Sequence, residues 1–427
     1  MDSGATVESF VSCFRRAAKL SPGKAFLTTQ AGVMTYGEML DRTARLAGFW
    51  AASGLTRGDR VVLATRDDTA AVVMFLSLIR SGLTAVILDP HSPAPEACNL
   101  IRASAARGIV LDRELRTDWQ PGGDLVTLEL QKPAGRTSPL FSKLLGRSQQ
   151  VPANQDSYPS ILQRFAPLDI SNEPAPDLVA YIMFTSGTTA RPKGVQITHS
   201  NLAHHLGTLS RQFGYNSDSR ILNVLPLHHT DGMTQGPMVA LWNCAAVFRP
   251  APFSIPGIGP LLDSIYSERI THFVTVPTAL ALILRLGQEY GSSFRTPGFR
   301  FVISAAAQLE SALWSTFEET FHTRIVNMYG LTESVTGGLF SGPDDDSHRI
   351  GTIGKPVDCE ARIVDNDGND VPDGTPGELL MRGGHIMKGY LNNDADTAAV
   401  LRDGWFFSGD IATRDHDGFY RIVGRKK

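Results

Sequence analysis

The sequence predicts an α/β protein that ends in a small, antiparallel, barrel-like β-rich part. Two apolar strand-like segments, residues 60–64 and 84–88, flank a helix-like segment at 69–81. Strand, helix and strand joined by short connections favour a parallel sheet covered by helices. Beyond residue 350 the strands are short, and the sequence repeats a turn signal that is typical of hairpins, as Asp367-Gly368, Asp373-Gly374, Asp403-Gly404 and Asp417-Gly418.

Composition limits the class of protein. The chain has 427 residues, 42% hydrophobic and 19% charged, which is ordinary for a globular protein of two to four structural units. A net charge of −3 does not favour nucleic acid or an anionic membrane surface as a partner. The longest apolar segments, 70–79 and 274–286, are too short or too interrupted to span a bilayer, and no signal peptide opens the chain. We therefore expect a cytoplasmic protein without a membrane span.

The first part of the chain alternates predicted helices and strands. Apolar residues recur at helical spacing over residues 7–19, and a second helix is predicted over 36–53, where Thr35 and Glu38 form a capping box. From about 115 to 176, Pro, Gly, Ser and Gln cluster and the apolar periodicity fades. We expect a long surface excursion there, partly disordered.

Residues 178–202 carry the strongest motif. A strand-length apolar run at 178–184 is followed by a loop rich in hydroxyls and glycine, with one lysine: Thr185, Ser186, Gly187, Thr188, Thr189, Ala190, Arg191, Pro192, Lys193 and Gly194. Glycine lets backbone amides approach an anion, hydroxyls donate hydrogen bonds, and lysine adds a positive charge. Such a loop suits a polyphosphate. A short strand at 195–197 and a helix capped by Thr198 or Ser200 follow.

Two other interpretations of this loop are weaker. A P-loop needs a second glycine before its lysine, Ser or Thr after it, and a helix next. Here Pro192 and Gly194 flank Lys193, and a strand follows. A solvated linker seldom follows an apolar strand and seldom carries a lone Pro-Lys-Gly.

The stretch from 181 to 202 resembles the phosphate loop of the adenylate-forming superfamily, which comprises acyl- and aryl-CoA ligases, nonribosomal adenylation domains and luciferases. The usual form is TSGTTGxPKG, and Ala190 replaces one glycine here. The resemblance covers nearly the whole chain. It implies α/β sheet subdomains over 1–349, a β-rich subdomain over 350–427, and ATP with Mg²⁺. In this resemblance Lys193 and the 185–189 residues hold phosphates.

A second motif, Asn-Met-Tyr-Gly-Leu-Thr-Glu-Ser, occupies residues 327–334 after a predicted strand at 324–328. A carboxylate beside a hydroxyl suits a hard cation that carries phosphate oxygens, and an aromatic ring suits stacking on a base. The motif matches the family's YGxTE. The resemblance implies that Asn327 and Tyr329 contact adenine, Thr332 the α-phosphate region, and Glu333 the magnesium ion.

Two further nucleotide contacts are predicted near the C-terminus. Asp410 ends a Ser-Gly-Asp sequence that matches the family's [ST]-G-D, and a carboxylate can accept both ribose hydroxyls. Arg425 matches a family arginine that reaches ribose or phosphate, and Ile422 in the same segment is added to the nucleotide site. A plain basic tail is the alternative interpretation of these last residues.

The acid is expected near residues 226–232, Pro-Leu-His-His-Thr-Asp-Gly. A metal site is disfavoured there, because adjacent side chains rarely point at one ion. The resemblance instead places His229 beside the acyl pocket and the carboxylate, so the catalytic candidates are Lys193, His229, Thr332 and Glu333. Candidate pocket residues are mostly apolar, which favours a fatty or aryl acid: His229, Thr230, Met233, Val276, Ala305, Ala306, Ala307 and Val335.

The small residues at 304–307 follow a predicted strand at 299–303. The family usually has glycines here that border both adenine and acyl group, so Ala305 and Ala306 are also nucleotide candidates. Tight helix packing explains the small residues equally well. A strand and a helix with proline in its first turn are predicted over 270–286.

Three functions stay open. The first is activation of a carboxylic acid and transfer to the thiol of CoA or of a carrier protein's phosphopantetheine. The second is amino-acid adenylation, which is disfavoured because Thr230 stands where such domains place an aspartate and Leu331 where they commonly have proline. The third is a silent nucleotide-binding module, which intact phosphate, adenine, ribose and magnesium positions argue against.

In the resemblance, Lys427 falls at the hinge before a small C-terminal domain that carries a lysine for adenylation. We therefore expect the N-terminal core of a longer enzyme, able to bind nucleotide and acid but slow to turn over. If Lys193→Ala and Glu333→Ala bound Mg·ATP as well as the parent, the assigned ATP roles would be wrong.

Overall fold

The computed structural model describes residues 9–130, 157–169, 172–185, 192–250 and 253–426. The chain divides into two compact units, one formed by 1–40 with 173–427 and the other by 41–172. All predicted site residues belong to the first unit. Helix α2 (Tyr36–Ala52) runs across the boundary at residue 40. Among the described residues, no helix combines the length and apolar character needed to cross a membrane.

The unit of residues 41–172 is built on four parallel strands in the order β4-β3-β5-β6. The predicted strand, helix and strand are confirmed as β3 (Arg60–Ala64), α3 (Asp68–Arg80) and β4 (Thr84–Ile87). Helix α3 is buried along most of its length, which explains its nearly continuous apolar sequence. The remaining elements are α4 (Ala94–Ser104), β5 (Gly108–Asp112), α5 (Arg113–Trp119), β6 (Val126–Leu130) and α7 (Tyr158–Arg164).

The prediction of a surface excursion over residues 115–176 is wrong for part of that range. Strand β6 pairs in parallel with β5 along its whole length, and α7 is a helix. Leu128 and Ile161 are fully buried, so these short elements take part in the core although proline and glycine surround them. Residues 131–156 and 170–171, the rest of the predicted disordered part, lie outside the described residues.

The larger unit contains a nine-stranded sheet in the order β15-β14-β13-β12-β11-β9-β10-β1-β2. Its centre is parallel: β9 (Arg220–Asn223), β10 (Ala246–Arg249), β11 (His272–Thr275), β12 (Phe301–Ser304) and β13 (Ile325–Tyr329). At one edge β1 (Ala25–Thr29) continues the parallel part beside β10, and β2 (Gly32–Thr35) pairs antiparallel with β1. At the other edge β14 (Leu339–Ser341) and β15 (Lys355–Pro356) are added by antiparallel pairing.

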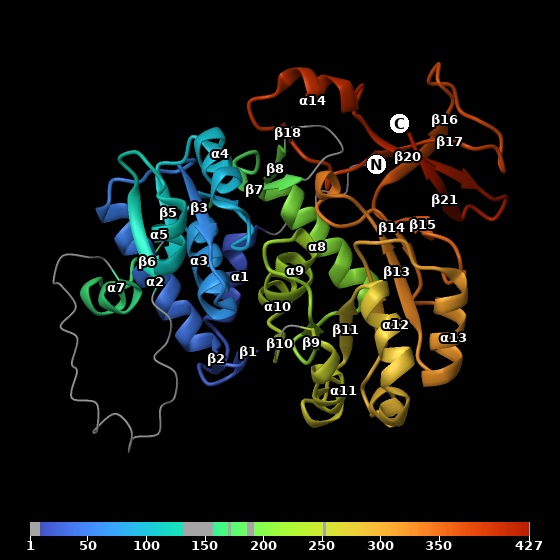
Figure 1. Ribbon diagram of the computed structural model, residues 1–427, viewed down its shortest axis with the longest axis horizontal. Coiled ribbons are helices and arrows are strands. Elements are labelled where there is room, and N and C mark those ends of the chain that lie inside the picture. The colour runs from blue at the N-terminus through green and yellow to red at the C-terminus, as the bar shows by residue number, and fades with distance from the viewer. Residues whose placement is uncertain (1–8, 131–156, 170–171, 186–191, 251–252, 427) are drawn as a thin grey trace. The chain divides into compact units, whose positions relative to one another are not determined.

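Helices cover this sheet. One face is closed by α11 (Ile258–Ser267), α12 (Pro277–Leu286) and α13 (Ser311–Phe321) (Figure 1). Their apolar side chains form one core with those of the strands. The predicted Pro277 is the first residue of α12. The remaining helical elements of this unit before residue 300 are α1 (Phe10–Ala17), α8 (His199–Phe213), α9 (Thr230–Met233), a π-helical turn (Thr234–Met238), α10 (Val239–Asn243) and two 3-10 segments (Ile255–Gly257, Gln288–Arg295).

A second set of strands in the same unit is antiparallel, in the order β18-β8-β7. It comprises β7 (Val179–Thr185), β8 (Lys193–Thr198) and β18 (Gly389–Tyr390). The predicted strands on both sides of the phosphate loop are therefore confirmed. Thr198 caps α8 in a reciprocal capping box with Asn201, as its hydroxyl predicted.

The C-terminal part forms the predicted antiparallel, barrel-like sheet. Its strands are β16 (Glu360–Val364), β17 (Gly377–Arg382), β19 (Leu401–Arg402), β20 (Trp405–Arg414) and β21 (Tyr420–Arg425), with α14 (Asp394–Val400) before β19. Asp403 and Gly404 both have positive φ and join β19 to β20 as a two-residue hairpin, as predicted. Because β15 and β18 join other sheets, residues 350–427 are not a separate unit.

Candidate active site

Strands β7 and β8 bring the two ends of the predicted phosphate loop together. Thr185, the last residue of β7, lies opposite Lys193, the first of β8. Ser186, Gly187, Thr188 and Thr189 lie outside the described residues. Lys193 Nζ is 2.9 Å from a carboxylate oxygen of Asp396 and 5.1 Å from the centre of the Tyr390 ring. Lys193 thus lies between an acidic side chain and an aromatic face.

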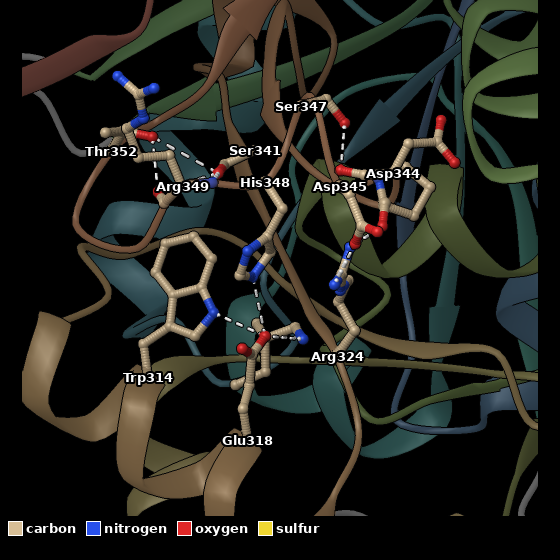
Figure 2. Close-up of polar contacts among 12 residues, drawn as sticks. Trp314, Glu318, Arg324, Ser341, Asp344, Asp345, Ser347, His348, Arg349 and Thr352 are labelled. Carbon is tan, nitrogen blue, oxygen red and sulfur yellow. Dashed lines mark hydrogen bonds and ion pairs between the residues drawn. The ribbon is translucent and has the colours of Figure 1, made fainter.

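A polar cluster beneath β13 sets the position of the second motif (Figure 2). Glu318, on α13, accepts hydrogen bonds from the Trp314 indole at 3.0 Å, the Ile325 amide at 2.6 Å and His348 at 3.0 Å. Burial by itself raises the pKa of Glu318, but these donors bring it below its usual value. The carboxylate therefore joins the start of β13 to α13 and to the 344–349 loop.

Asn327 ends a polar row at the carboxyl edge of the sheet. Thr275 lies opposite Ser304, and Ser304 opposite Asn327, on neighbouring parallel strands. The Asn327 amide donates to the Thr352 carbonyl at 2.8 Å and is buried. The carboxyl edge of an α/β sheet is where such folds commonly bind ligands. Ala305 and Val276 directly follow two members of this row, so the topology brings these candidates to one edge.

Tyr329, Asp410 and Arg425 meet where the nine-stranded sheet approaches β20 and β21. The Tyr329 hydroxyl donates to Asp410 Oδ2 at 2.6 Å. Arg425 lies opposite Asp410 in the β20–β21 pair, with Nε 3.6 Å from Oδ1. Burial and the neighbouring carboxylate raise the pKa of Tyr329 well above its usual value. Ile422, which pairs with Ala412, is half-buried further along β21.

Glu333 faces a cavity beside this group. Thr332 and Glu333 begin a short 3-10 turn (Thr332–Ser334) after β13, and the Tyr390 hydroxyl donates to Glu333 Oε1 at 2.7 Å. The cavity has a volume of about 330 Å³ and also receives Arg425 and Lys426. Lys426 pairs with the buried carboxylate of Glu378 at 2.9 Å. The cavity therefore combines one motif carboxylate with several cationic side chains.

The backbone after Glu333 is strained. Val335 has φ 64° and ψ −58°, and the Thr336 amide bonds to the Ser334 carbonyl at 2.8 Å, which makes a tight three-residue turn. A β-branched residue with positive φ is a true outlier, and such strain clusters at functional sites. Gly330 is required on the other side, because a Cβ there would lie 2.3 Å from the Gly337 nitrogen. The motif is thus folded back on itself.

A histidine cluster supports this turn from below. His205, on α8, is 2.6 Å from the Thr336 hydroxyl, and its ring lies 6.4 Å from that of His385. His204 stacks on His385 at 6.2 Å. Burial, with the neighbouring histidines, lowers the pKa of His205 well below its usual value and that of His385 to about 4. The rings of His205 and His385 are therefore neutral at physiological pH.

The predicted acyl residues are spread between buried and exposed positions. Thr230 and Met233 are buried in α9, and the Thr230 hydroxyl contacts Met183 of β7 at 3.3 Å. Val335 is fully buried, whereas Val276 is half-buried. His229 is exposed at the start of α9. Thr230 thus contacts β7, the strand that precedes the predicted phosphate loop.

The alanine segment after β12 adopts a conformation that favours glycine. Ala305 is buried, while Ala306 and Ala307 are exposed. Ala306 has φ 65°, which costs a residue with Cβ about 1–2 kcal/mol relative to glycine. A single positive-φ residue thus lies at the carboxyl edge of the sheet, between Ala305 and Ala307.

Asp231 does not offer an open carboxylate. Its Oδ1 accepts from the buried Gln235 amide at 2.6 Å. Burial raises the pKa of Asp231 to about 6, which is partly offset by that hydrogen bond. The carboxylate is therefore directed into the protein beside the π-helical turn.

Sequence reasoning did not find three residues of this site. Tyr390, Asp396 and Glu378 contact Glu333, Lys193 and Lys426 respectively. The only available signal was Gly389-Tyr390 before a new helix start at Asn393, which does not indicate a partner by itself. Long-range pairing of β18 with β8 brings Tyr390 and the following Asp396 to the site, and pairing of β17 with β20 brings Glu378 there.

Comparison with known proteins shows the family. The sequence family described as AMP-binding enzyme matches residues 14–391, so the chain belongs to the AMP-binding, adenylate-forming enzymes. A sulfoacetate–CoA ligase of Cupriavidus necator is 29% identical, covering 96% of this chain and 77% of that protein. A feruloyl-CoA synthase of an Amycolatopsis species is also 29% identical, with the same two coverages.

Solved structures show the same fold. Apo MatB from Rhodopseudomonas palustris matches with a TM-score of 0.83 and 25% identity, over 98% of this chain and 79% of that one. The N-terminal domain of FACL13 from Mycobacterium tuberculosis matches with a TM-score of 0.82 and 23% identity, over 98% of this chain and all of that chain (100%). The α/β architecture with an antiparallel C-terminal sheet is therefore that of the family's N-terminal domain.

Proposed function

We propose that this chain binds ATP and a carboxylic acid and joins them as an acyl-adenylate, with release of pyrophosphate. The acyl group then passes to a thiol, of CoA or of a carrier protein. The observation that carries the proposal is a connected set of contacts: Glu333 and Arg425 line one cavity, and Arg425 pairs with Asp410, which accepts from Tyr329. Lys193 pairs with the same 389–400 segment that holds Glu333.

The reaction asks the protein for alignment and charge compensation. A carboxylate oxygen attacks the α-phosphorus, and the bond from that phosphorus to the bridging oxygen breaks as pyrophosphate leaves. Two anions must therefore approach each other, which requires fixed positive groups and a preorganised site. Lys193, Arg425 and Lys426 supply positive charge on this side of the fold.

Magnesium fits the residues present. Glu333 is a half-exposed carboxylate that lines the cavity, and Tyr390 donates to one of its oxygens, Oε1. Carboxylate and hydroxyl oxygens are the ligands that Mg²⁺ prefers, and Thr332 adds a hydroxyl one residue away. When bound, the ion would offset negative charge on phosphate oxygens. Glu333 would hold it, and Tyr329 and Asp410 would orient the nucleoside.

The acid is proposed to be hydrophobic or aromatic. The candidate pocket residues Thr230, Met233 and Val276 carry no charge, and one carboxylate oxygen of Asp231 already accepts from Gln235. This supports an acid–thiol ligase over amino-acid adenylation, because an α-amino group needs an available carboxylate. The named relatives act on acids as different as sulfoacetate and ferulate, so they do not select one.

Calorimetric titration of this chain with acyl-sulfamoyl adenosines tests the proposal. These compounds mimic the adenylate and need no turnover. We expect fatty-acyl or aryl compounds to bind more tightly than aminoacyl ones, and Asp410→Asn to weaken all of them. If no member of the panel bound, and ATP did not bind either, the proposed function would be wrong. Preference for aminoacyl compounds would instead favour the amino-acid alternative.

A further inference from the structure

The segment of residues 389–400, formed by β18 and α14, is braced by its own hydrogen bonds. The Thr397 hydroxyl accepts from the Tyr390 amide at 2.9 Å and donates to the Asn393 carbonyl at 2.8 Å. The Asn393 side chain caps α14 by accepting from the Asp396 amide at 3.1 Å. Because β18 also pairs with β8, the segment has a fixed register against the strand that begins with Lys193.

This register sets Asp396 on the lysine predicted to serve the phosphates. Asp396 Oδ2 is 2.9 Å from Lys193 Nζ, and the same oxygen accepts from the Asn393 amide at 2.8 Å. The ammonium also lies over the Tyr390 ring. Neighbouring Lys193 and Asn393 hold the pKa of the Asp396 carboxyl below its usual value, so the group is ionised at neutral pH.

A carboxylate in this position opposes a polyphosphate. Its negative charge satisfies the ammonium that a β- or γ-phosphate would use, and it repels a phosphate that approaches the same nitrogen. The Asp396 side chain is 41% exposed and that of Lys193 is 21% exposed, so the pair is loosely held and open to exchange. Asp396 retains its bond to Asn393 when Lys193 leaves it.

We propose that Asp396 is a competing counter-ion for Lys193: it holds the lysine when no nucleotide is bound, and the triphosphate displaces it. Lys193 then favours ATP binding, whereas the negative charge of Asp396 weakens it. This inference rests on the proposed function, since it requires Lys193 to contact ATP.

The test is calorimetric titration of Mg·ATP into this chain and its Asp396→Asn variant at low ionic strength. Asparagine keeps the size of the side chain and its bond to Asn393 but removes the charge. We expect about two- to fivefold tighter binding, the range of an exposed ion pair. The gain should shrink in 0.5 M salt, because salt screens exposed charges.

Asp394→Asn is the matched control. Asp394 lies in the same first turn of α14, is exposed, and carries the same charge, whereas Lys193 pairs with Asp396. This variant should bind Mg·ATP like the parent. In a Lys193→Gln background, Asp396→Asn should no longer tighten binding, since the effect acts through the lysine.

Two results would overturn the inference. If Asp396→Asn bound Mg·ATP no more tightly than Asp394→Asn, the charge would not compete. If it bound more weakly than the parent, Asp396 would position Lys193 instead of opposing ATP. Failure of the parent itself to bind Mg·ATP is a different outcome, which would refute the proposed function and the inference with it.

Discussion

Two polar clusters hold the residues of the candidate site, and they are built differently. Beneath β13, the Glu318 carboxylate gathers three donors, and its side chain is 19% exposed (Figure 2). Beside the predicted phosphate loop, Asp396 pairs with Lys193 and the Tyr390 hydroxyl bonds Glu333, and the Asp396 side chain is 41% exposed. The first arrangement resists exchange of partners, whereas the second permits it.

This difference indicates that the two clusters have different roles. A carboxylate with several buried donors stabilises the fold, because removing it leaves those donors without partners. Single contacts at an exposed site contribute little to stability and are free to change when a charged ligand arrives. The clusters should therefore respond in opposite ways to substitution: one through unfolding, the other through ligand binding.

Glu318→Ala should have the largest effect. It orphans the Trp314 indole, the Ile325 amide and His348, so we expect the free energy of unfolding to fall by about 2–3 kcal/mol. Urea denaturation measures this, with Glu319→Ala on the exposed side of the same helix as control. Equal stability of the two variants would remove the distinction between the clusters.

Lys193→Ala should behave in the opposite way. We expect Mg·ATP to bind about 10- to 100-fold more weakly, because a charge-assisted hydrogen bond to phosphate is lost. Its free energy of unfolding should change by less than about 1 kcal/mol, since the pair with Asp396 is partly exposed. Calorimetry and urea denaturation of one preparation give both numbers, and Lys388→Ala, an exposed lysine, is the control. A large loss of stability without loss of binding would contradict the assignment.

Tyr390→Phe should have a smaller and more selective effect. It removes only the hydroxyl that holds Glu333 Oε1, so we expect ATP to bind about three- to tenfold more weakly in Mg²⁺. Binding in EDTA should not change, because the hydroxyl acts through the proposed metal ligand. Tyr266→Phe, at an exposed tyrosine, serves as control. Equal weakening with and without Mg²⁺ would show that Tyr390 does not act through Glu333.

The same contrast explains what the sequence could predict. Local signals were sufficient for β3, α3, the Thr35–Glu38 capping box and the Asp403-Gly404 hairpin, because each depends on residues a few positions apart. Motif resemblance supplied the names of candidate nucleotide contacts. Local composition led to an error: apolar periodicity fades after residue 115, yet β6 and α7 still form around a few buried residues.

Partners that are distant in the sequence could not be predicted. Tyr390 and Glu333 are 57 positions apart, and Tyr329 and Asp410 are 81 positions apart. No periodicity or spacing connects such pairs, since strand pairing across the fold brings them together. The strained Val335 was equally hidden, because valine gives no signal for a positive φ.

The smallest predicted effect concerns the pH dependence of stability and the buried His385. Its ring faces His204 and His205 of α8, and Asp358 acts on it from the turn before β16. Burial lowers the pKa of His385 from its ordinary 6.5 to about 4. As pH falls below about 6.5, the unfolded chain therefore binds a proton that the folded chain excludes, and stability is lost down to about pH 4.

At pH 6 the loss from this one group should be about 0.8 kcal/mol, a value that depends only on the unfolded pKa while the folded pKa stays well below 6. His385→Gln removes the titration. The gap between the free energies of unfolding of parent and variant should therefore shift by this amount between pH 8 and pH 6. The other buried groups are the same in parent and variant, so their contributions cancel in this difference. They include Asp231, whose raised pKa changes the free energy of unfolding in the opposite direction. His416→Gln, at a histidine whose side chain is 86% exposed, is the control variant. A constant gap for His385→Gln would mean that the folded protein tolerates a protonated His385. The histidine cluster next to the turn at Val335 would then include a charged ring.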